Sequence, residues 1–98
     1  MFEAFDVITN TLLPYKPRKI ILFGSQARGT ATDKSDVDIC VVIETTRKHE
    51  LTAELYIALD LEAPVDIIVY TPAEWESCLA DRTSFAYKID TEGVVLYG

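Results

Sequence analysis

Residues 19–29 read KIILFGSQARG, and residues 35–43 read SDVDICVVI. The first segment is β-branched and aromatic up to Phe23 and breaks at Gly24, which is typical of a buried strand that opens into a loop. The second segment is an apolar strand from residue 36 onward, with two acids at its start. A loop rich in Gly, Ser and Thr joins the two. We expect these two strands to form the centre of the fold.

Helical periodicity flanks the two strands on both sides. Residues 2–13 and 47–61 carry apolar side chains at spacings of three and four, so each segment is predicted to form an amphipathic helix. Pro14 ends the first of these helices. Residues 71–74 read TPAE, which places a capping Thr before Pro at the first helical position and Glu three residues after the Thr. This pattern predicts the start of another helix.

Two further strands and a short helix complete the pattern. Residues 65–70 and 94–97 are apolar runs typical of strands, and residues 84–89 allow one or two helical turns before Gly93. The predicted order is helix, strand, strand, helix, strand, helix, with a short helix possible at 26–29 and a small strand at the end. This order predicts an α/β sandwich around a short sheet.

Composition narrows the class of protein. A chain of 98 residues with 49 % apolar content matches one globular domain, spanning residues 1–98. The net charge of −7 argues against direct nucleic-acid binding, which depends on clustered Lys and Arg. No apolar run reaches the ~20 residues that cross a bilayer. Glu3 and Asp6 stand where a signal peptide would be basic. A soluble, cytoplasmic protein is expected.

Asp36 and Asp38 form a pair of acids with a defined geometry. They are two residues apart on a predicted strand, so both carboxylates project from the same side of it. Mg²⁺ takes oxygen ligands and keeps several waters, so one or two carboxylates and substrate phosphates complete its shell. The pair therefore fits a metal site. Two surface acids in a turn would show the same spacing, and spacing alone leaves both interpretations open.

Asp66 is the one charged residue in the run VDIIV at 65–69. Burying a lone carboxylate in such a strand is costly unless another group pairs with it. A metal ion is a ready partner.

The loop after the first strand has features of a phosphate site. Gly24 would let a phosphate approach the backbone closely, and residues 26–29 could start a short helix whose free amides point at an anion. Ser25 adds a hydroxyl donor and Arg28 a cation, so the loop is a plausible cradle for a triphosphate. The other interpretation, a turn with a capping Ser and an exposed Arg, also fits these residues.

Together, GSQARG at 24–29 and SDVD at 35–38 resemble the signature of the minimal nucleotidyltransferases of the DNA polymerase beta superfamily. The order of predicted strands and helices agrees with that family along nearly the whole chain. The resemblance implies the nucleotidyltransferase fold, a short mixed β-sheet flanked by helices in a single domain. It also implies a nucleoside triphosphate substrate, ATP, and Mg²⁺, with two ions expected.

The resemblance assigns roles to individual residues. The expected metal and catalytic residues are Asp36, Asp38 and Asp66. The expected nucleotide-binding residues are Gly24, Ser25, Arg28, Gly29 and Ser35. Asp66 would lie beside the acceptor, either as a metal ligand or as the base that takes the hydroxyl proton. Arg28 either contacts phosphate or pairs with an acid such as Asp33.

The resemblance also suggests an acceptor. Single domains of this kind are similar to the antitoxin halves of toxin–antitoxin pairs whose toxin is an all-helical HEPN-type ribonuclease. Members of that group transfer AMP to a tyrosine of the toxin, and the same reaction is expected here. A small-molecule or RNA acceptor is the alternative, because no residue of the chain names the acceptor.

A binding module that neutralises a partner by contact alone is a second class of function. Its contact residues would be aromatic side chains in the C-terminal third, Trp75, Phe85 and Tyr87. The same three residues could instead complete the core. The presence of all three acids and of the Gly24-Ser25 turn favours the enzyme.

Overall fold

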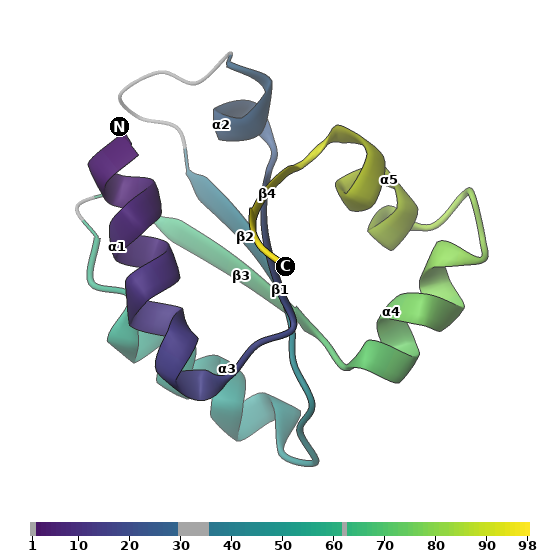
Figure 1. Cartoon of the computed structure of the whole chain (residues 1–98), viewed down its shortest axis with the longest axis horizontal. Helices are drawn as coiled ribbons and strands as arrows, with labels where there is room; N and C mark the ends of the chain where they lie inside the picture. The colour runs from purple at the N-terminus through teal and green to yellow at the C-terminus, as the bar shows by residue number, and fades with distance from the viewer. Residues whose placement is uncertain (1, 30–35, 62) are drawn as a thin grey trace.

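A computed structural model describes residues 2–29, 36–61 and 63–98 of the chain (Figure 1). The described elements, in chain order, are α1 (Phe2–Leu12), a 3-10 turn (Leu13–Tyr15), β1 (Lys19–Phe23), α2 (Ser25–Arg28), β2 (Val37–Val42), α3 (Lys48–Ala58), β3 (Val65–Tyr70), α4 (Pro72–Leu79), α5 (Phe85–Glu92) and β4 (Val94–Tyr97). Within these residues no helix has the length and apolar character needed to span a bilayer.

The four strands form one mixed sheet in the order β3-β2-β1-β4. β1 runs antiparallel to both of its neighbours, whereas β2 and β3 are parallel and are joined by α3. A parallel connection needs a crossover of this kind, since a tight turn cannot return the chain to the same end of the sheet. The expected short mixed sheet flanked by helices is therefore confirmed.

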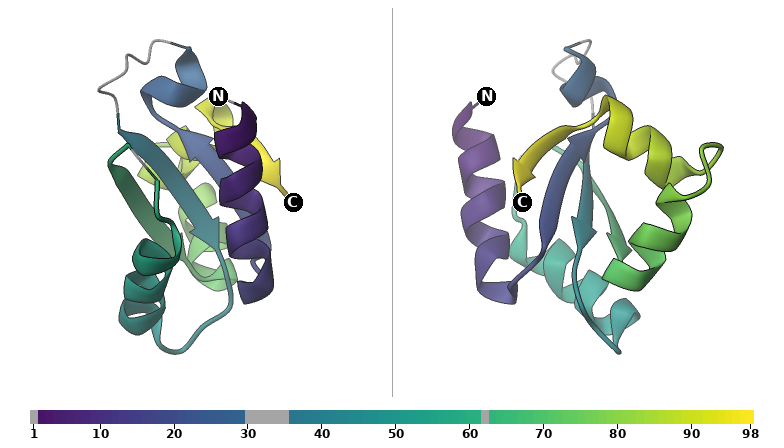
Figure 2. Two further views of the ribbon diagram at one scale, coloured as in Figure 1. Left: turned by 90° about the vertical axis from the view of Figure 1, so that its left-hand side faces the viewer. Right: turned by 45° about the vertical axis from the view of Figure 1, so that its right-hand side comes forward.

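Helices cover both faces of the sheet. Figures 1 and 2 show α1 and α3 on one side of the strands and α4 and α5 on the other. Two cores result, one on each face. The larger core, under α1 and α3, includes Ile8, Leu12, Ile20, Ile39, Leu55 and Val69. The smaller core, under α4 and α5, consists of Ile21, Cys40, Val42, Trp75, Ala86 and Ile89.

Strand β2 is apolar on both sides because both of its faces are covered. Ile39 and Val41 face the larger core, whereas Cys40 and Val42 face the smaller one. Along the α4–α5 face the same alternation brings Asp38 to the end of the strand. That end is where the functional residues lie.

The predicted helix at 47–61 is too long. Helix α3 ends at Ala58, and Leu59 leaves the helical conformation with φ −87° and ψ 84°. Leu59 nevertheless stays buried at the end of the larger core, so its apolar character is explained by packing outside the helix. The periodicity continued past the helix because the chain remains against the core while it turns toward β3.

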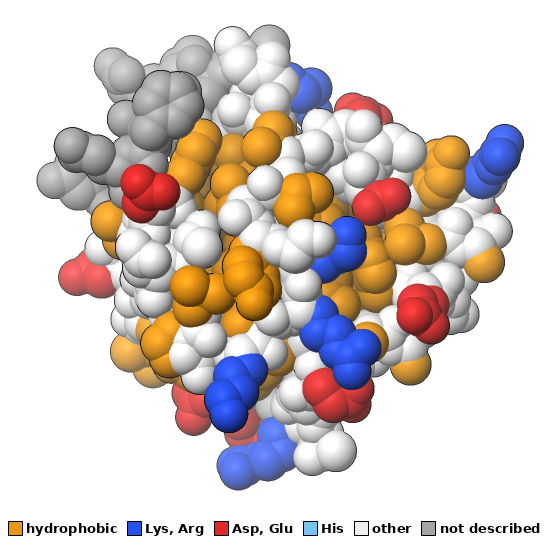
Figure 3. Space-filling model, in the orientation of Figure 1, with side chains coloured by type: hydrophobic (Ala, Val, Ile, Leu, Met, Phe, Trp, Pro, Cys, Tyr) orange, Lys and Arg blue, Asp and Glu red, His pale blue; other side chains and the backbone are white. Residues whose placement is uncertain are grey.

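The aromatic residues of the C-terminal third divide between core and surface. Trp75 is 4 % exposed and contacts Tyr70 edge-on, with the ring centroids 5.2 Å apart. It completes the smaller core and is not a contact residue. Phe85 is 49 % exposed, and Tyr87 is partly buried. On the face of the molecule seen in Figure 3, basic and acidic side chains are interspersed, and the basic side chains of this face do not form a broad patch.

The start of α4 is a complete capping box. The Thr71 hydroxyl accepts a hydrogen bond from the Glu74 amide at 3.2 Å, and the Glu74 carboxylate accepts one from the Thr71 amide at 2.9 Å. Lys48 of α3 donates to the same carboxylate at 2.9 Å. The box predicted from residues 71–74 is confirmed, and it fixes the point at which the chain turns from β3 onto the second face of the sheet.

We predict that Thr71→Ala lowers the free energy of unfolding by about 1 kcal/mol, because an orphan helix amide loses its acceptor. Urea unfolding followed by circular dichroism measures the change. The matched variant Glu74→Gln keeps an acceptor for the Thr71 amide and loses only the exposed ion pair with Lys48. It should cost less than about 0.5 kcal/mol. Equal losses in the two variants would contradict this prediction, because they would show that the ion pair stabilises the protein as much as the cap does.

Candidate active site

The predicted acids meet at one end of the parallel strand pair. Asp38 on β2 is the register partner of Asp66 on β3, and paired residues of neighbouring strands project to the same face. That face is the one covered by α4 and α5. Asp36 precedes β2 by one residue and lies close enough for its charge to act on Asp38. The structure therefore brings together the three acids that the sequence singled out.

The helix layer stops short of these carboxylates. Two residues along β2 on the same face, Cys40 is fully buried, and burial raises the pKa of its thiol to about 12. Asp38 is only partly buried, and both Asp36 and Asp66 are exposed. The cost of burying the Asp66 charge, considered in the sequence analysis, does not arise because this residue is exposed. β3 is the edge of the sheet, so the Asp66 carboxylate reaches water without a desolvation cost.

Burial and three neighbouring charges shift the pKa of Asp38. Burial raises the pKa of Asp38 above its ordinary value, and the charges of Asp66 and Asp36 raise it further. The nearby charge of Arg28 acts in the opposite direction and lowers it. Neighbouring negative charges make the ionised form of this carboxylate unfavourable, and a cation shared by the three acids would relieve that repulsion.

Gly24 presses the turn between β1 and α2 against the acids. Its φ of +75° lies in the region that favours glycine. A Cβ atom at this position would overlap Oδ2 of Asp38 and would lie 3.1 Å from Cγ. The preceding residue, Phe23, is the register partner of Asp38. Glycine is therefore required twice, for the backbone conformation and for the close approach of the turn to the carboxylate.

The rest of the predicted loop forms a single helical turn. α2 spans Ser25–Arg28, and Gly29 closes it in the left-handed conformation by donating its amide hydrogen to the Ser25 carbonyl. Ser25 is partly buried at the start of this turn, and Arg28 is exposed at its end. The predictions for Ser35 and for an Arg28–Asp33 pair fall on residues outside those that the structure describes.

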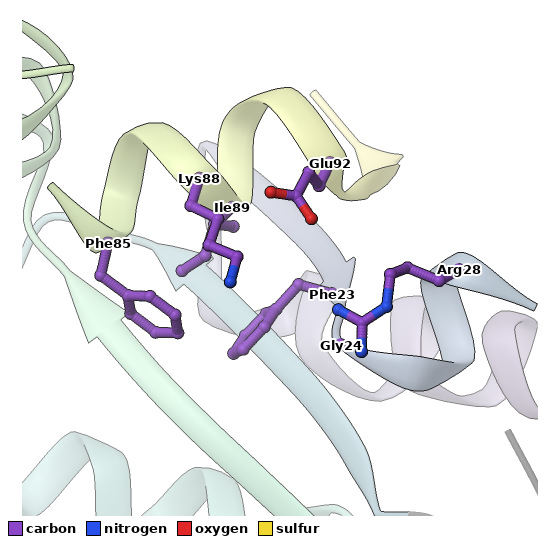
Figure 4. Close-up of a pocket in the computed structure, with 7 residues that line it drawn as sticks. All are labelled: Phe23, Gly24, Arg28, Phe85, Lys88, Ile89 and Glu92. Carbon is purple, nitrogen blue, oxygen red and sulfur yellow. The ribbon is translucent and has the colours of Figure 1, made fainter. Parts of the chain in front are cut away.

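A pocket of about 150 Å³ opens between α2 and α5, beside the acids (Figure 4). It is lined by Phe23, Gly24, Arg28, Phe85, Lys88, Ile89 and Glu92. Of these residues, the sequence had indicated Gly24 and Arg28 as nucleotide ligands. Lys88 and Glu92 were missed. No local motif marks them, since their place in the site depends on how α5 packs over β1.

The donor set can be compared with what Mg²⁺ requires. Among the described residues, no three Asp, Glu, His or Cys side chains stand in an arrangement that would hold an ion by themselves. Mg²⁺ does not need such a cage, because it binds through one or two carboxylates together with waters and substrate phosphates. The mutual repulsion at Asp38, which an ion would relieve, and the all-oxygen donors fit this hard cation.

Known proteins share both the sequence and the fold. Residues 8–96 match the family model described as nucleotidyltransferase domain. A relative in Methanocaldococcus jannaschii named "Putative protein adenylyltransferase" is 31 % identical over 95 residues, which cover 96 % of this chain and 93 % of the relative. The match therefore extends over nearly the whole of both proteins.

Two solved structures have the same architecture. A chain in the crystal structure of a toxin–antitoxin with AMP-PNP superposes with a TM-score of 0.60 at 29 % identity, covering 96 % of this chain and 73 % of that one. A structure described as a "putative nucleotidyltransferase" from Sulfolobus solfataricus gives a TM-score of 0.57 at 19 % identity, covering 96 % and 79 %, and shows the fold alone. On the family match over residues 8–96 and the relative 31 % identical, the chain belongs to the nucleotidyltransferase domain family and is a nucleotidyltransferase.

Proposed function

We propose that this nucleotidyltransferase transfers AMP from ATP to a tyrosine hydroxyl of a HEPN-type toxin and acts as its antitoxin, the whole chain forming one catalytic domain. The observation that carries the proposal is the position of Asp38. Its carboxylate lies within reach of the charges of Asp36 and Asp66 and against the backbone of Gly24. A nucleotide held at this turn would have its phosphates beside the acids.

In this proposal the turn at Gly24 and helix α2 bind the nucleotide. Gly24 would bring the backbone of the turn, and with it the bound phosphates, beside the Asp38 carboxylate. The Ser25 hydroxyl can donate a hydrogen bond to them, and the Arg28 guanidinium supplies a cation. Gly29 closes this turn, and Ser35 completes the set of nucleotide-binding residues that we propose. The solved toxin–antitoxin neighbour contains AMP-PNP, an ATP analogue, which supports a nucleoside triphosphate as substrate.

Asp36, Asp38 and Asp66 would hold two Mg²⁺ ions, which supply positive charge beside the phosphates when bound. In the transfer, the acceptor oxygen forms a bond to the α-phosphorus of ATP. The bond from that phosphorus to the bridging oxygen breaks, and pyrophosphate leaves with the electron pair. The acceptor loses its hydroxyl proton, and Asp66 would receive this proton or bind the ion beside the acceptor.

The acceptor side of the site is open. Asp66 is exposed on the edge strand β3, so a bulky acceptor can approach the carboxylate from beyond the sheet. The amide of the next residue, Ile67, donates to the Tyr56 hydroxyl at 2.9 Å. That edge position is therefore occupied, which favours the approach of a single side chain over addition of a whole strand. A protein acceptor fits this opening, and the name of the archaeal relative supports it.

The enzyme can be separated from a contact-only module by the double variant Asp36→Asn, Asp38→Asn. Purified protein is incubated with its toxin partner, ATP and Mg²⁺, and the partner is weighed by mass spectrometry. We predict that wild type adds the mass of AMP to the partner, whereas the variant loses at least about 100-fold in rate because the charge that would bind the ion is gone.

A matched control removes two exposed carboxylates that belong neither to the proposed site residues nor to the pocket lining, with the double variant Asp6→Asn, Asp60→Asn. It changes the net charge by the same amount and should retain transfer. Neutralisation of the partner by the site variant without any mass change in the wild-type sample would leave the contact-only function in place of the enzyme. Transfer to a small molecule or RNA, with none to protein, would replace the proposed acceptor.

Asp38→Asn alone tests the electrostatic cost of the site. The folded state raises the pKa of Asp38 above 3.8, so it favours the protonated form more than the unfolded chain does. Stability is therefore lost as the pH rises through the raised pKa, and the cost is fully present at neutral pH. We predict that the variant gains about 0.5 kcal/mol at neutral pH, a modest value because solvent screens a partly exposed group. The gain should vanish below pH 3.8, as measured by urea unfolding at both pH values.

Ser25→Ala tests the phosphate turn. The variant removes one hydroxyl donor from a partly buried position and leaves the backbone of α2 in place. We predict that the affinity for ATP with Mg²⁺ is weaker by about tenfold or more, because one hydrogen bond to a charged group contributes about 1.5 kcal/mol or more. Isothermal titration calorimetry measures it. Equal affinities of the two proteins would remove Ser25 from the site.

A further inference from the structure

The pocket between α2 and α5, named here the α2–α5 pocket, adjoins Asp38 through Gly24. Gly24 lines it, and the same residue lies against the carboxylate of Asp38. A molecule that contacts the acids and follows the turn past Gly24 therefore enters this pocket. Its floor is β1 and its outer wall is α5, whose Ala86 and Ile89 pack against the sheet.

Two cations point into the pocket from opposite walls. Figure 4 shows the Lys88 ammonium directed from α5 toward the interior and the Arg28 guanidinium extending toward it from α2. Within the described residues, neither side chain forms an ion pair, whereas Arg47 pairs with Glu50 and Lys48 with Glu74. Unpaired cations on facing walls of one pocket are notable in a chain with a net charge of −7.

The pocket is small for a whole nucleotide. Its volume of about 150 Å³ is well below the ~300 Å³ at which sites for complete small molecules begin. It has room for one part of a nucleoside triphosphate. In the proposed reaction the α-phosphate lies beside the acids, so the β- and γ-phosphates are the part that can follow the turn past Gly24 into the pocket. Their negative charge is suited to two cations.

We propose that the α2–α5 pocket receives the polyphosphate of the nucleoside triphosphate and that Lys88 is its second cation, opposite Arg28. This inference rests on the proposed function, because it assumes a nucleoside triphosphate at the acids. It adds a residue of α5 to the phosphate-binding turn. α5 thereby acts as a wall of the substrate site as well as a cover for the smaller core.

Glu92 distinguishes a negatively charged ligand from a neutral nucleobase in the pocket. Its carboxylate lies at the same pocket, on the side of Arg28, without an ion pair to either cation (Figure 4). Beside a polyphosphate this carboxylate repels the ligand, so Glu92→Gln should tighten binding. If a nucleobase occupied the pocket, Glu92 would instead accept a hydrogen bond from it, and the same variant would weaken binding.

The aromatic end of the pocket provides the competing occupant. Phe23 and Phe85 meet edge-on at 5.6 Å with an interplanar angle of 86°, and Phe85 is half exposed. An exposed aromatic face can stack a base. The charge on the two long walls favours phosphate over base, and the two occupants respond differently to the variants below.

The experiment is calorimetric titration of the full chain with inorganic tripolyphosphate, and separately with adenosine, in excess Mg²⁺. We predict that Lys88→Gln weakens tripolyphosphate binding about tenfold, the value of one charge-assisted contact, and that Lys88→Arg stays within about twofold of wild type. Glu92→Gln should bind tripolyphosphate about twofold to fivefold more tightly. Adenosine binding should be unchanged in all three variants.

Arg82→Gln is the matched control. Arg82 is an exposed cation in the turn before α5 and does not line the pocket, so its removal changes the net charge equally. It should leave tripolyphosphate binding within about twofold of wild type, because solvent and salt screen distant charges. Lys88 is itself exposed, so its variants should fold, and thermal melting of each protein verifies this.

Three results would overturn the proposal: wild type that does not bind tripolyphosphate, a Lys88→Gln variant that binds it as wild type does, or equal losses in Lys88→Gln and Arg82→Gln. Adenosine binding that falls in Lys88→Gln while tripolyphosphate binding is kept would assign the pocket to the base. The proposed function is tested separately by the mass of the partner. If AMP transfer is observed but Lys88 has no effect on tripolyphosphate binding, only the assignment of the pocket is wrong. If Lys88 contributes to binding but no transfer is observed, only the proposed reaction is wrong.

Discussion

Two parallel strands pair in the register that puts Asp38 beside Asp66, and this pairing costs free energy where the two charges meet. The cost is carried by the rest of the strands. Ile39 and Ile67 pair one step further along and are buried in the larger core, so a slip of one residue would turn apolar side chains toward water. Packing of the core thus fixes this register although it places two negative charges side by side. A cation bound between the acids would remove the same cost.

The helices cover the two faces of the sheet to different extents. α1 and α3 cover one face over the length of the strands and supply most of the apolar burial. α4 and α5 cover the other face only in part, which leaves the acids at an open end while Cys40 beneath the helices is fully buried. The capping box at Thr71 sets where this second layer begins. A local hydrogen-bond pattern therefore helps to decide how much of the sheet remains available for substrate.

The site combines opposite charges on a short stretch of surface. Acids from β2 and β3 lie on one side of Gly24, and the cations of the α2–α5 pocket lie on the other. The charge of Arg28 already acts on Asp38 across this turn. A nucleoside triphosphate with Mg²⁺ has both signs of charge, so a site of this kind can hold its metal end and its phosphate end at once. The net charge of the chain says nothing of this local order.

The sequence by itself determined the elements and the residue types of the site. Strand limits at 19–23 and 65–70 and the cap at Thr71 were predicted because each depends on periodicity or hydrogen bonds within a few residues. The tertiary structure alone decided that β3 is an edge strand with an exposed acid, where helix α3 ends, and that α5 brings Lys88 and Glu92 to the pocket. Those outcomes depend on packing between segments far apart in the chain, which local patterns do not encode.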